Sequence, residues 1–323
     1  MKQRNFRTIE TNGVSLRTVV EGEGPLVILL HGWPQCWYLW RHQIDPLVEA
    51  GFKVAVPDQR GYGGSDAPEE VNAYDIIHLT GDVVGIADAL GYATFTVVGH
   101  DWGAPVAWNT ALLHEERVNA VVGMSVPHSR YPVGALTQQE NFGDRFWYIV
   151  YFQKPGIAEA ELETDIRRSL RMIYASASGS NAERIFFKPK PSTSSFLDGL
   201  LDSHEQALGV TQEDLDYYVE QYKLSGFRGG LNWYRNLDRN MEITPQLQDK
   251  KISQPALFIA GEKDAVLKFP GMNLDEMNNW VPNLKEKIII PGVGHWVSVE
   301  SPEVVNEALL SFLKDLRSQN KNL

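Results

Sequence analysis

Three residues that could together perform covalent catalysis occur in the order Asp101, Asp264 and His295, each just beyond a predicted strand. Asp101 lies in the motif G-x-D-x-G, which is typical of a strand that turns sharply into a helix and exposes a nucleophile. Glycines are needed there because the turn crowds its own backbone. Asp101 would then lie at a helix N-terminus, where backbone N–H groups and the helix dipole keep a carboxylate ionised.

The choice of aspartate as nucleophile narrows the reaction. A carboxylate attacks acyl carbon poorly, but it can attack a strained or activated sp³ carbon, and the product is an ester on the enzyme. A second step must hydrolyse that ester, so a base and an oxyanion hole are also required. Taken alone, Asp101 could simply cap a helix, but the other parts of the predicted site favour the nucleophile.

The base and its orienting acid are predicted near the C-terminus. His295 follows KIIIPGVG, whose glycines let the loop place an imidazole, and Asp264 ends the run ALFIAGEKD. A neutral His295 could take a proton from water while Asp264 fixes its tautomer. Glu262 and Glu300 are weaker candidates for the acid, because Asp264 better matches the strand-end pattern. Other histidines are predicted to be structural or scaffold residues: His31, His42, His78, His100, His114 and His204.

The oxyanion hole is predicted from His31-Gly32-Trp33-Pro34, which follows the first core strand. An H-G-x-P loop can direct the Trp33 backbone N–H at a developing negative charge. The Trp102 N–H, one residue past the nucleophile, would be the second donor. Removing one donor from a comparable site typically costs about 3 kcal/mol of transition-state stabilisation, so both donors matter to the mechanism.

The elements that must position these residues form an α/β fold, with a mostly parallel central sheet and helices on both faces. A hairpin is expected around Asn12-Gly13. Continuous apolar runs separated by helical stretches are typical of buried parallel strands. These runs are Pro25 to Leu30, Phe52 to Val56, Phe95 to Val98, Val118 to Met124, Ala256 to Ala260 and Lys287 to Ile290. Core helices are predicted at Ile76 to Leu90, Pro105 to His114 and Pro302 to Arg317.

The middle of the chain lacks comparable strand runs and is rich in aromatic and charged residues. We therefore expect residues 1–128 and 245–323 to form the core domain, and residues 129–244 to form an inserted helical lid, or cap domain. The lid elements predicted are helices at Ile157 to Ala175, Gln212 to Leu224 and Leu231 to Arg239, and a surface loop at Lys188 to Phe196.

Composition and charge exclude several function classes. The formal net charge is −11 and the pI is about 5.2, which argues against binding to nucleic acid or to anionic membranes. The N-terminus lacks the apolar stretch of a secretory signal, and the early apolar run is too short to span a bilayer. The single cysteine, Cys36, can form neither an internal disulfide nor a zinc site alone. No cofactor or metal is predicted, and a cytoplasmic location is expected.

Together these motifs resemble the soluble-type epoxide hydrolases of the α/β-hydrolase fold, over nearly the whole chain. The matching strings are HGWP, DQRGYGGSD, GHDWG, YFQKPGIAEAEL, SGFRGGLNWYRN, GEKD and GVGHW. The resemblance implies that a small apolar epoxide and water give a vicinal diol, through an ester on Asp101 that water activated by His295 hydrolyses. It also implies that two lid tyrosines hold the epoxide oxygen, Tyr151 and Tyr234, and that a cis peptide bond precedes Pro34.

Other proteins of this fold remain as alternatives. A haloalkane dehalogenase would share the nucleophile and the base, but the H-G-x-P loop here lacks the asparagine that often helps to bind halide. A fluoroacetate dehalogenase would be expected to carry arginines just after the nucleophile, where this chain has Gly103, Ala104 and Pro105. A ligand receptor with little turnover would usually keep a serine in place of Asp101. The epoxide hydrolase is the favoured interpretation.

Overall fold

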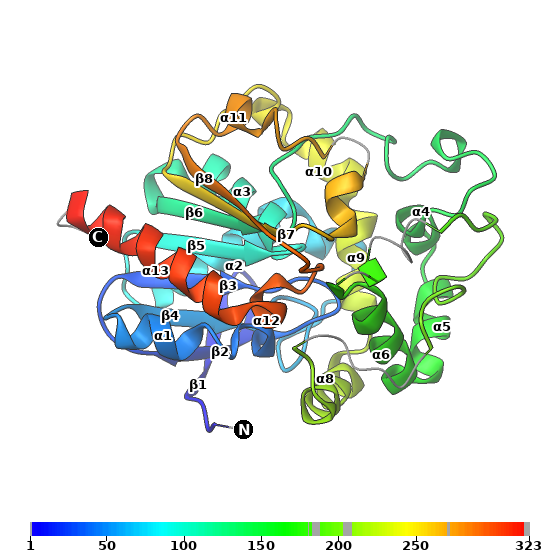
Figure 1. Cartoon of the computed structure of the whole chain (residues 1–323), viewed down its shortest axis with the longest axis horizontal. Helices are drawn as coiled ribbons and strands as arrows, with labels where there is room; N and C mark the ends of the chain where they lie inside the picture. Colours follow the sequence, from blue (N-terminus) through cyan, green and yellow to red (C-terminus); the bar gives the residue numbers. More distant parts are fainter. Residues whose placement is uncertain (1, 180, 183–187, 203–208, 270–271, 320–323) are drawn as a thin grey trace.

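The computed structural model describes residues 2–179, 181–182, 188–202, 209–269 and 272–319. In Figure 1 a large sheet carries helices on both faces, and a group of helices covers the end of the sheet where the parallel strands finish. The α/β fold with inserted lid helices that the sequence predicts is confirmed. His204, predicted to be structural, lies outside the described residues.

The sheet has eight strands in the order β1-β2-β4-β3-β5-β6-β7-β8. The first two pairings, β1 with β2 and β2 with β4, are antiparallel, and all later neighbours are parallel. The strands are β1 (Phe6–Thr11), β2 (Val14–Glu21), β3 (Leu26–Leu30), β4 (Lys53–Pro57), β5 (Phe95–His100), β6 (Val118–Met124), β7 (Ala256–Gly261) and β8 (Leu284–Ile290).

Burial explains why the central strands have continuous apolar sequences. Every residue of β3, β5 and β7 is buried, because helices cover both faces of these strands. The predicted hairpin between β1 and β2 is present, with Asn12 at φ 47° and Gly13 at φ 77°. Both angles lie in the left-handed region, as a tight two-residue hairpin turn requires.

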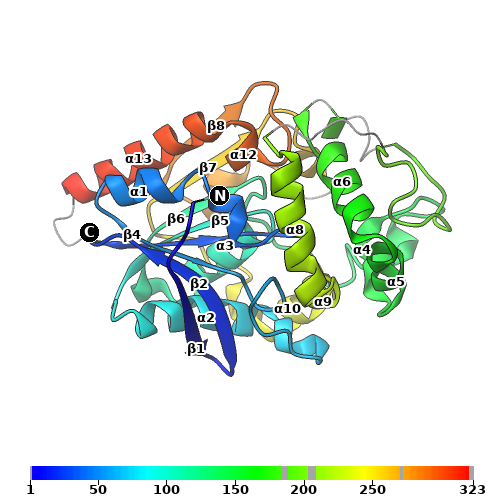
Figure 2. The ribbon, with the colours of Figure 1, turned by 90° about the horizontal axis from the view of Figure 1, so that it is seen from below.

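Two pairs of helices sandwich the sheet. Figures 1 and 2 show α1 (Ile44–Glu49) and α13 (Pro302–Gln319) together on one face, and α2 (Ile76–Ala89) and α3 (Gly103–Leu113) on the other. Two short helices, α11 (Met277–Trp280) and α12 (Val297–Glu300), flank the last strand. None of the helices in the described part of the chain has the length and apolar character needed to cross a membrane.

The lid helices lie between β6 and β7, and the sequence placed most of them approximately. The helix expected over residues 157–175 is two helices, because the Asp165 side chain accepts a hydrogen bond from the Arg168 N–H and starts a new one. The domain boundaries at 128/129 and 244/245 remain a prediction. The lid helices are α4 (Tyr148–Gln153), α5 (Ile157–Thr164), α6 (Ile166–Ser176), α8 (Gln212–Ser225), α9 (Arg228–Arg235) and α10 (Leu237–Ile243).

Helix α9 is held very close to the core. A Cβ on Gly61, in the loop after β4, would overlap the backbone of Gly229, so two glycines permit this approach. The Trp233 indole N–H donates to the Arg60 carbonyl at 3.2 Å, which satisfies both groups away from water. The helix that carries Tyr234 is thereby fixed at the carboxyl end of the sheet.

Candidate active site

The turn between β5 and α3 places Asp101 as the sequence predicts. Its φ is 51°, a left-handed conformation that costs a non-glycine residue energy and is typical of nucleophile turns. A Cβ on Gly103 would overlap the Leu30 carbonyl, and a Cβ on Gly99 would overlap the Gly103 backbone. There is therefore no room for a side chain at either position. The turn directs the Asp101 carboxylate away from the sheet and toward the lid.

Backbone donors hold the Asp101 carboxylate. Oδ1 accepts a hydrogen bond from the Trp33 N–H at 2.7 Å, and the Trp102 N–H also hydrogen-bonds to the carboxylate. Burial alone would raise the pKa of Asp101, but His295 and the Trp102 N–H outweigh it, so the pKa lies below its usual value. The structure thus brings both predicted oxyanion donors to the nucleophile. The expected cis peptide bond between Trp33 and Pro34 is present.

His295 lies between two carboxylates. Its Nδ1 is 3.1 Å and 3.0 Å from the two Asp264 oxygens, and its Nε2 is 3.4 Å from Asp101 Oδ2. Burial disfavours the charged imidazole, but Asp264 and Asp101 outweigh it and raise the pKa of His295 to about 10. In the free protein His295 is therefore positively charged at neutral pH, and loss of the Asp101 charge would lower its pKa and so increase the neutral fraction that can accept a proton.

The backbone of His295 is anchored by groups that the sequence did not identify as part of the site. Its carbonyl accepts hydrogen bonds from His100 Nε2 at 2.8 Å and from the Ser125 hydroxyl at 3.0 Å. Its N–H donates to the carbonyl of Ala177, in the lid segment after α6, at 2.9 Å. Ser125 directly follows β6, the strand that pairs with β5, and its φ of 67° makes it a second residue in the strained left-handed region.

Glu300 ties the loop of the base to the lid. Its carboxylate accepts from the N–H groups of Gly179 at 3.0 Å, Gly294 at 2.8 Å and Trp296 at 3.2 Å. Burial raises the pKa of this carboxyl, although the three backbone donors oppose the rise. The expectation that Glu300 is not the acid that orients His295 agrees with these contacts, because its oxygens are directed to backbone donors.

Two lid tyrosines, Tyr148 on α4 and Tyr234 on α9, line the same pocket as Asp101. Their rings are 5.8 Å apart and nearly perpendicular. Burial raises the pKa of both hydroxyls well above the usual value, and the negative charge of Asp101 raises it further. Both phenols therefore remain protonated at neutral pH and can donate hydrogen bonds. Of the two predicted tyrosines, the structure brings Tyr234 to the nucleophile.

The structure does not bring the other predicted tyrosine, Tyr151, to the nucleophile. Its hydroxyl donates to Glu161 on α5 at 2.8 Å, and it does not line the pocket that holds Asp101. The packing of α4 explains the difference. Tyr148 and Phe152 are four residues apart, so they share a helix face, and Phe152 is fully buried. Tyr148 thus lies on the inward face of α4, whereas Tyr151 lies beside it.

Substitution of Tyr151 and of Tyr148 should have different effects on the reaction of Asp101. Tyr151→Phe removes a hydroxyl that contacts Glu161, so the rate of Asp101 alkylation by an aryl epoxide should stay within about twofold of wild type. Tyr148→Phe should lower that rate by about tenfold or more if the Tyr148 hydroxyl, which lines the pocket with Asp101, donates a proton to the leaving oxygen. Stopped-flow tryptophan fluorescence measures the alkylation rate. The reverse order of effects would restore the original assignment of Tyr151.

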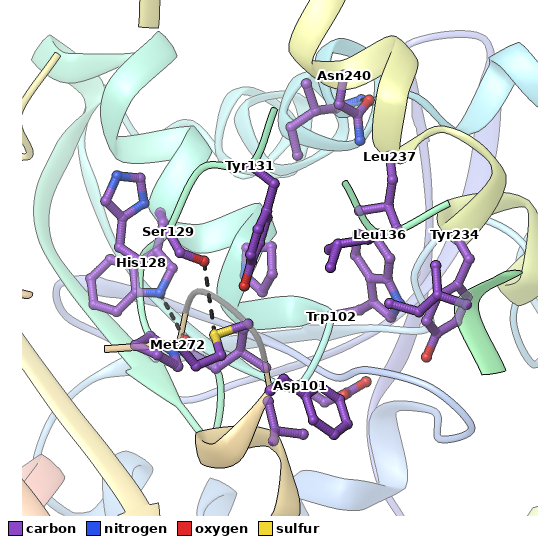
Figure 3. Close-up of a pocket in the computed structure, with 18 of the residues that line it drawn as sticks. Asp101, Trp102, His128, Ser129, Tyr131, Leu136, Tyr234, Leu237, Asn240 and Met272 are labelled. Atoms are coloured by element: carbon purple, nitrogen blue, oxygen red, sulfur yellow. Dashed lines mark hydrogen bonds between the residues drawn. The ribbon is translucent and has the colours of Figure 1, made fainter. Parts of the chain in front are cut away.

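The pocket above Asp101 is mainly apolar. Its volume is about 120 Å³. Figure 3 shows the Asp101 carboxylate and the Tyr234 hydroxyl toward one end, with Leu136, Leu237 and Asn240 on other walls. Such a pocket favours a substrate with an apolar arm that approaches a few fixed polar groups. The described residues contain no cluster of three or more His, Cys, Asp or Glu side chains that could hold a metal ion.

Comparisons with known proteins agree with this geometry. The α/β-hydrolase-fold family matches residues 25–302. Epoxide hydrolase A of Mycobacterium tuberculosis is 46% identical over 96% of this chain and 97% of its own length. The crystal structure of epoxide hydrolase A from Mycobacterium thermoresistibile is 44% identical, with a TM-score of 0.90 over 97% of this chain and 98% of that one.

A further solved structure has the same arrangement of the chain. An epoxide hydrolase from an endophytic Streptomyces superposes with a TM-score of 0.91 at 38% identity, covering 98% of this chain and 97% of that one. Full-length similarity at this level includes the lid as well as the sheet. The chain therefore belongs to the epoxide hydrolases of the α/β-hydrolase fold.

Proposed function

We propose that this chain hydrolyses small apolar epoxides to vicinal diols, with Asp101 as nucleophile, His295 as base, Asp264 as its orienting acid, and Tyr148 and Tyr234 as proton donors. The observation that carries the proposal is one pocket in which an ionised carboxylate shares its walls with two protonated phenols. A carboxylate supplies the nucleophile for a strained carbon, and a phenol supplies the proton that the leaving oxygen needs.

In the first step, Asp101 opens the ring. Oδ1 accepts the hydrogen bond from the Trp33 N–H, and Oδ2, which lies 3.4 Å from His295 Nε2, is the oxygen that forms the new C–O bond. The epoxide C–O bond breaks, and the oxygen that leaves takes a proton from Tyr148 or Tyr234. An alkoxide is far more basic than a phenolate, so even a phenol with a raised pKa can protonate it. The product is a hydroxyalkyl ester and a tyrosinate.

In the second step, His295 activates water. The ester carries no charge, so only Asp264 of the two carboxylates still raises the pKa of the His295 imidazolium. His295 therefore releases a proton, and the tyrosinate takes up a proton, so the net charge of the site does not change. Neutral His295 then removes a proton from water as the water attacks Cγ of Asp101. The negative charge develops on Oδ1, which accepts from the Trp33 N–H, and the Trp102 N–H at the same carboxyl group is the second donor. Collapse breaks the ester bond, and the diol oxygen takes the proton that His295 holds. The Asp101 carboxylic acid that remains then passes its own proton to His295, which restores the carboxylate and the imidazolium of the free protein.

The dehalogenase alternative differs in its leaving group. A halide leaves without a proton, so paired phenols facing the nucleophile would serve no purpose in that reaction. The two functions are separated by measuring diol formation from styrene oxide and 1,2-epoxyhexane against halide release from 1-bromohexane, each with an Asp101→Asn control. Diol formation without halide release supports the epoxide function. Halide release without diol formation would replace it by the dehalogenase.

The expected partners and location follow from the same features. An acidic chain with an apolar pocket has the character of an enzyme for small neutral molecules, acting without nucleic acid or membrane. A cytoplasmic location is part of this proposal, supported by the single buried cysteine. Fractionation of the source cells, followed by an immunoblot, tests the location directly.

A further inference from the structure

A second, smaller chamber lies on the other side of the nucleophile. Asp101, Tyr148 and Tyr234 line both this chamber and the large pocket, so the three reacting groups stand between the two. The small chamber has a volume of about 40 Å³, against about 120 Å³ for the large pocket. Its other walls include Trp33, Ile173, Ala177, Phe196, His295 and Trp296.

These volumes set what each space can hold. An apolar cavity of about 150 Å³ holds benzene, and a cavity needs roughly 10–15 Å³ to hold one water molecule. The large pocket therefore accepts about one aromatic ring or a short alkyl chain, whereas the small chamber has room for a few water molecules but not for a second ring. His295 lines the small chamber and not the large pocket, so the water that it activates must lie in the small chamber.

Phe196 is the wall that keeps this chamber small. It lines the small chamber on one side and a neighbouring lid cavity of about 140 Å³ on the other. Tyr148 is the other residue that lines both spaces. Phe146, Lys188 and Leu200 line the lid cavity but not the small chamber. Removing the Phe196 ring would join the two spaces.

The position of Phe196 is fixed along its backbone and around its ring. Its N–H donates to Glu161 Oε2 at 3.0 Å, and its carbonyl accepts from Lys190 Nζ at 2.9 Å. The same Glu161 oxygen accepts from the Tyr151 hydroxyl at 2.8 Å, which gives Tyr151 a structural purpose. The Phe196 ring packs against Phe152, with centroids 4.9 Å apart, and is 3% exposed. The partition is therefore a rigid, built feature.

We propose that Phe196 makes this enzyme selective for epoxides that carry one bulky apolar substituent, with only hydrogen or a very small group on the second ring carbon. The inference rests on the proposed function and specifies its substrate class. When Asp101 attacks, the bulky arm occupies the large pocket and the other carbon faces the small chamber. A second bulky arm would need the space of the hydrolytic water, so such an epoxide either fails to bind or forms an ester that hydrolyses slowly.

The test compares an epoxide with one ring, styrene oxide, with one that has two, trans-stilbene oxide. Wild type should show a kcat/KM for styrene oxide at least about tenfold above that for stilbene oxide. Phe196→Ala joins the small chamber to the lid cavity, so it should raise the stilbene oxide to styrene oxide ratio of kcat/KM by about tenfold or more. Comparing ratios between variants removes the difference in intrinsic reactivity of the two epoxides.

Phe146→Ala is the matched control, because it removes the same ring from the lid cavity without touching the small chamber. Its ratio should stay near that of wild type. Phe196→Leu provides a milder opening if the alanine variant does not fold, and should move the ratio in the same direction. Equal kcat/KM values for the two epoxides in wild type would overturn the selectivity alone. So would a rise of the stilbene oxide to styrene oxide ratio in Phe146→Ala as large as that in Phe196→Ala. Failure of wild type to turn over styrene oxide and 1,2-epoxyhexane would overturn the proposed function instead.

Discussion

The Tyr148→Phe and Tyr234→Phe double variant should lose nearly all ability to open an epoxide ring. General acid catalysis is typically worth about 100- to 10,000-fold, and both phenols that line the pocket with Asp101 are removed. Each single variant should lose less, because one donor remains to protonate the leaving oxygen. The effect should fall on alkylation of Asp101 rather than on folding, since each change deletes one hydroxyl and keeps the ring.

Pre-steady-state alkylation by styrene oxide, measured for wild type, both single variants and the double variant, checks this result. Tyr151→Phe is a matched control, because it removes a phenol from the same helix as Tyr148 but one that contacts Glu161. Circular dichroism and thermal melts confirm that the variants fold. If the double variant alkylates within a few-fold of wild type, the tyrosines are packing residues and their assignment as acids is wrong.

His295→Gln should stop turnover after the first step. Asp101 needs no base to attack, so the variant should still form the ester, but no group remains to remove a proton from water. Loss of the base is expected to lower the hydrolysis rate by about 100- to 10,000-fold. Intact-mass spectrometry should therefore show enzyme heavier by one epoxide molecule within a single turnover. Adding Asp101→Asn should abolish the adduct.

The position of the imidazole predicts how this step depends on pH. In the free protein burial lowers the pKa of His295, but Asp264 and Asp101 outweigh this effect and raise the pKa to about 10. Esterification removes the Asp101 charge, so the pKa of His295 in the ester must be lower. Hydrolysis of the isolated ester should therefore reach half its maximal rate at a pH below 10, and Asp264→Asn should shift this midpoint lower still. A His295→Gln variant that turns over normally, or that never becomes alkylated, contradicts the role of base.

Much of this arrangement follows from the sequence because each part depends on local pattern. The buried strands are continuous apolar runs, and Asp101, Asp264 and His295 each follow such a run. The carboxyl ends of parallel strands meet at one edge of a sheet, so three distant residues could be expected to converge. The glycines around Asp101 identified the turn, because no other residue fits that space.

The parts that were missed depend on contacts across long sequence separations. Matching strings along α4 led to Tyr151, but which face of a short helix points inward depends on how the lid packs, with Phe152 as the buried neighbour. Ser125 and Glu300 act on backbone groups of a loop and of the lid, and backbone groups leave no residue pattern. Phe196 lies in a stretch predicted only as a surface loop, where an anchored aromatic ring has no periodicity to reveal it.

The most direct test of the account is the fate of oxygen in a single turnover. Enzyme in excess is mixed with styrene oxide in water enriched in oxygen-18, and the peptide that contains Asp101 is then analysed by mass spectrometry. Because water attacks Cγ of the Asp101 ester, one heavy oxygen should enter that carboxylate, and the first diol formed should carry an unlabelled oxygen from the enzyme. Label found in the diol with none in Asp101 would mean that water attacks the epoxide directly, and the covalent mechanism would be wrong.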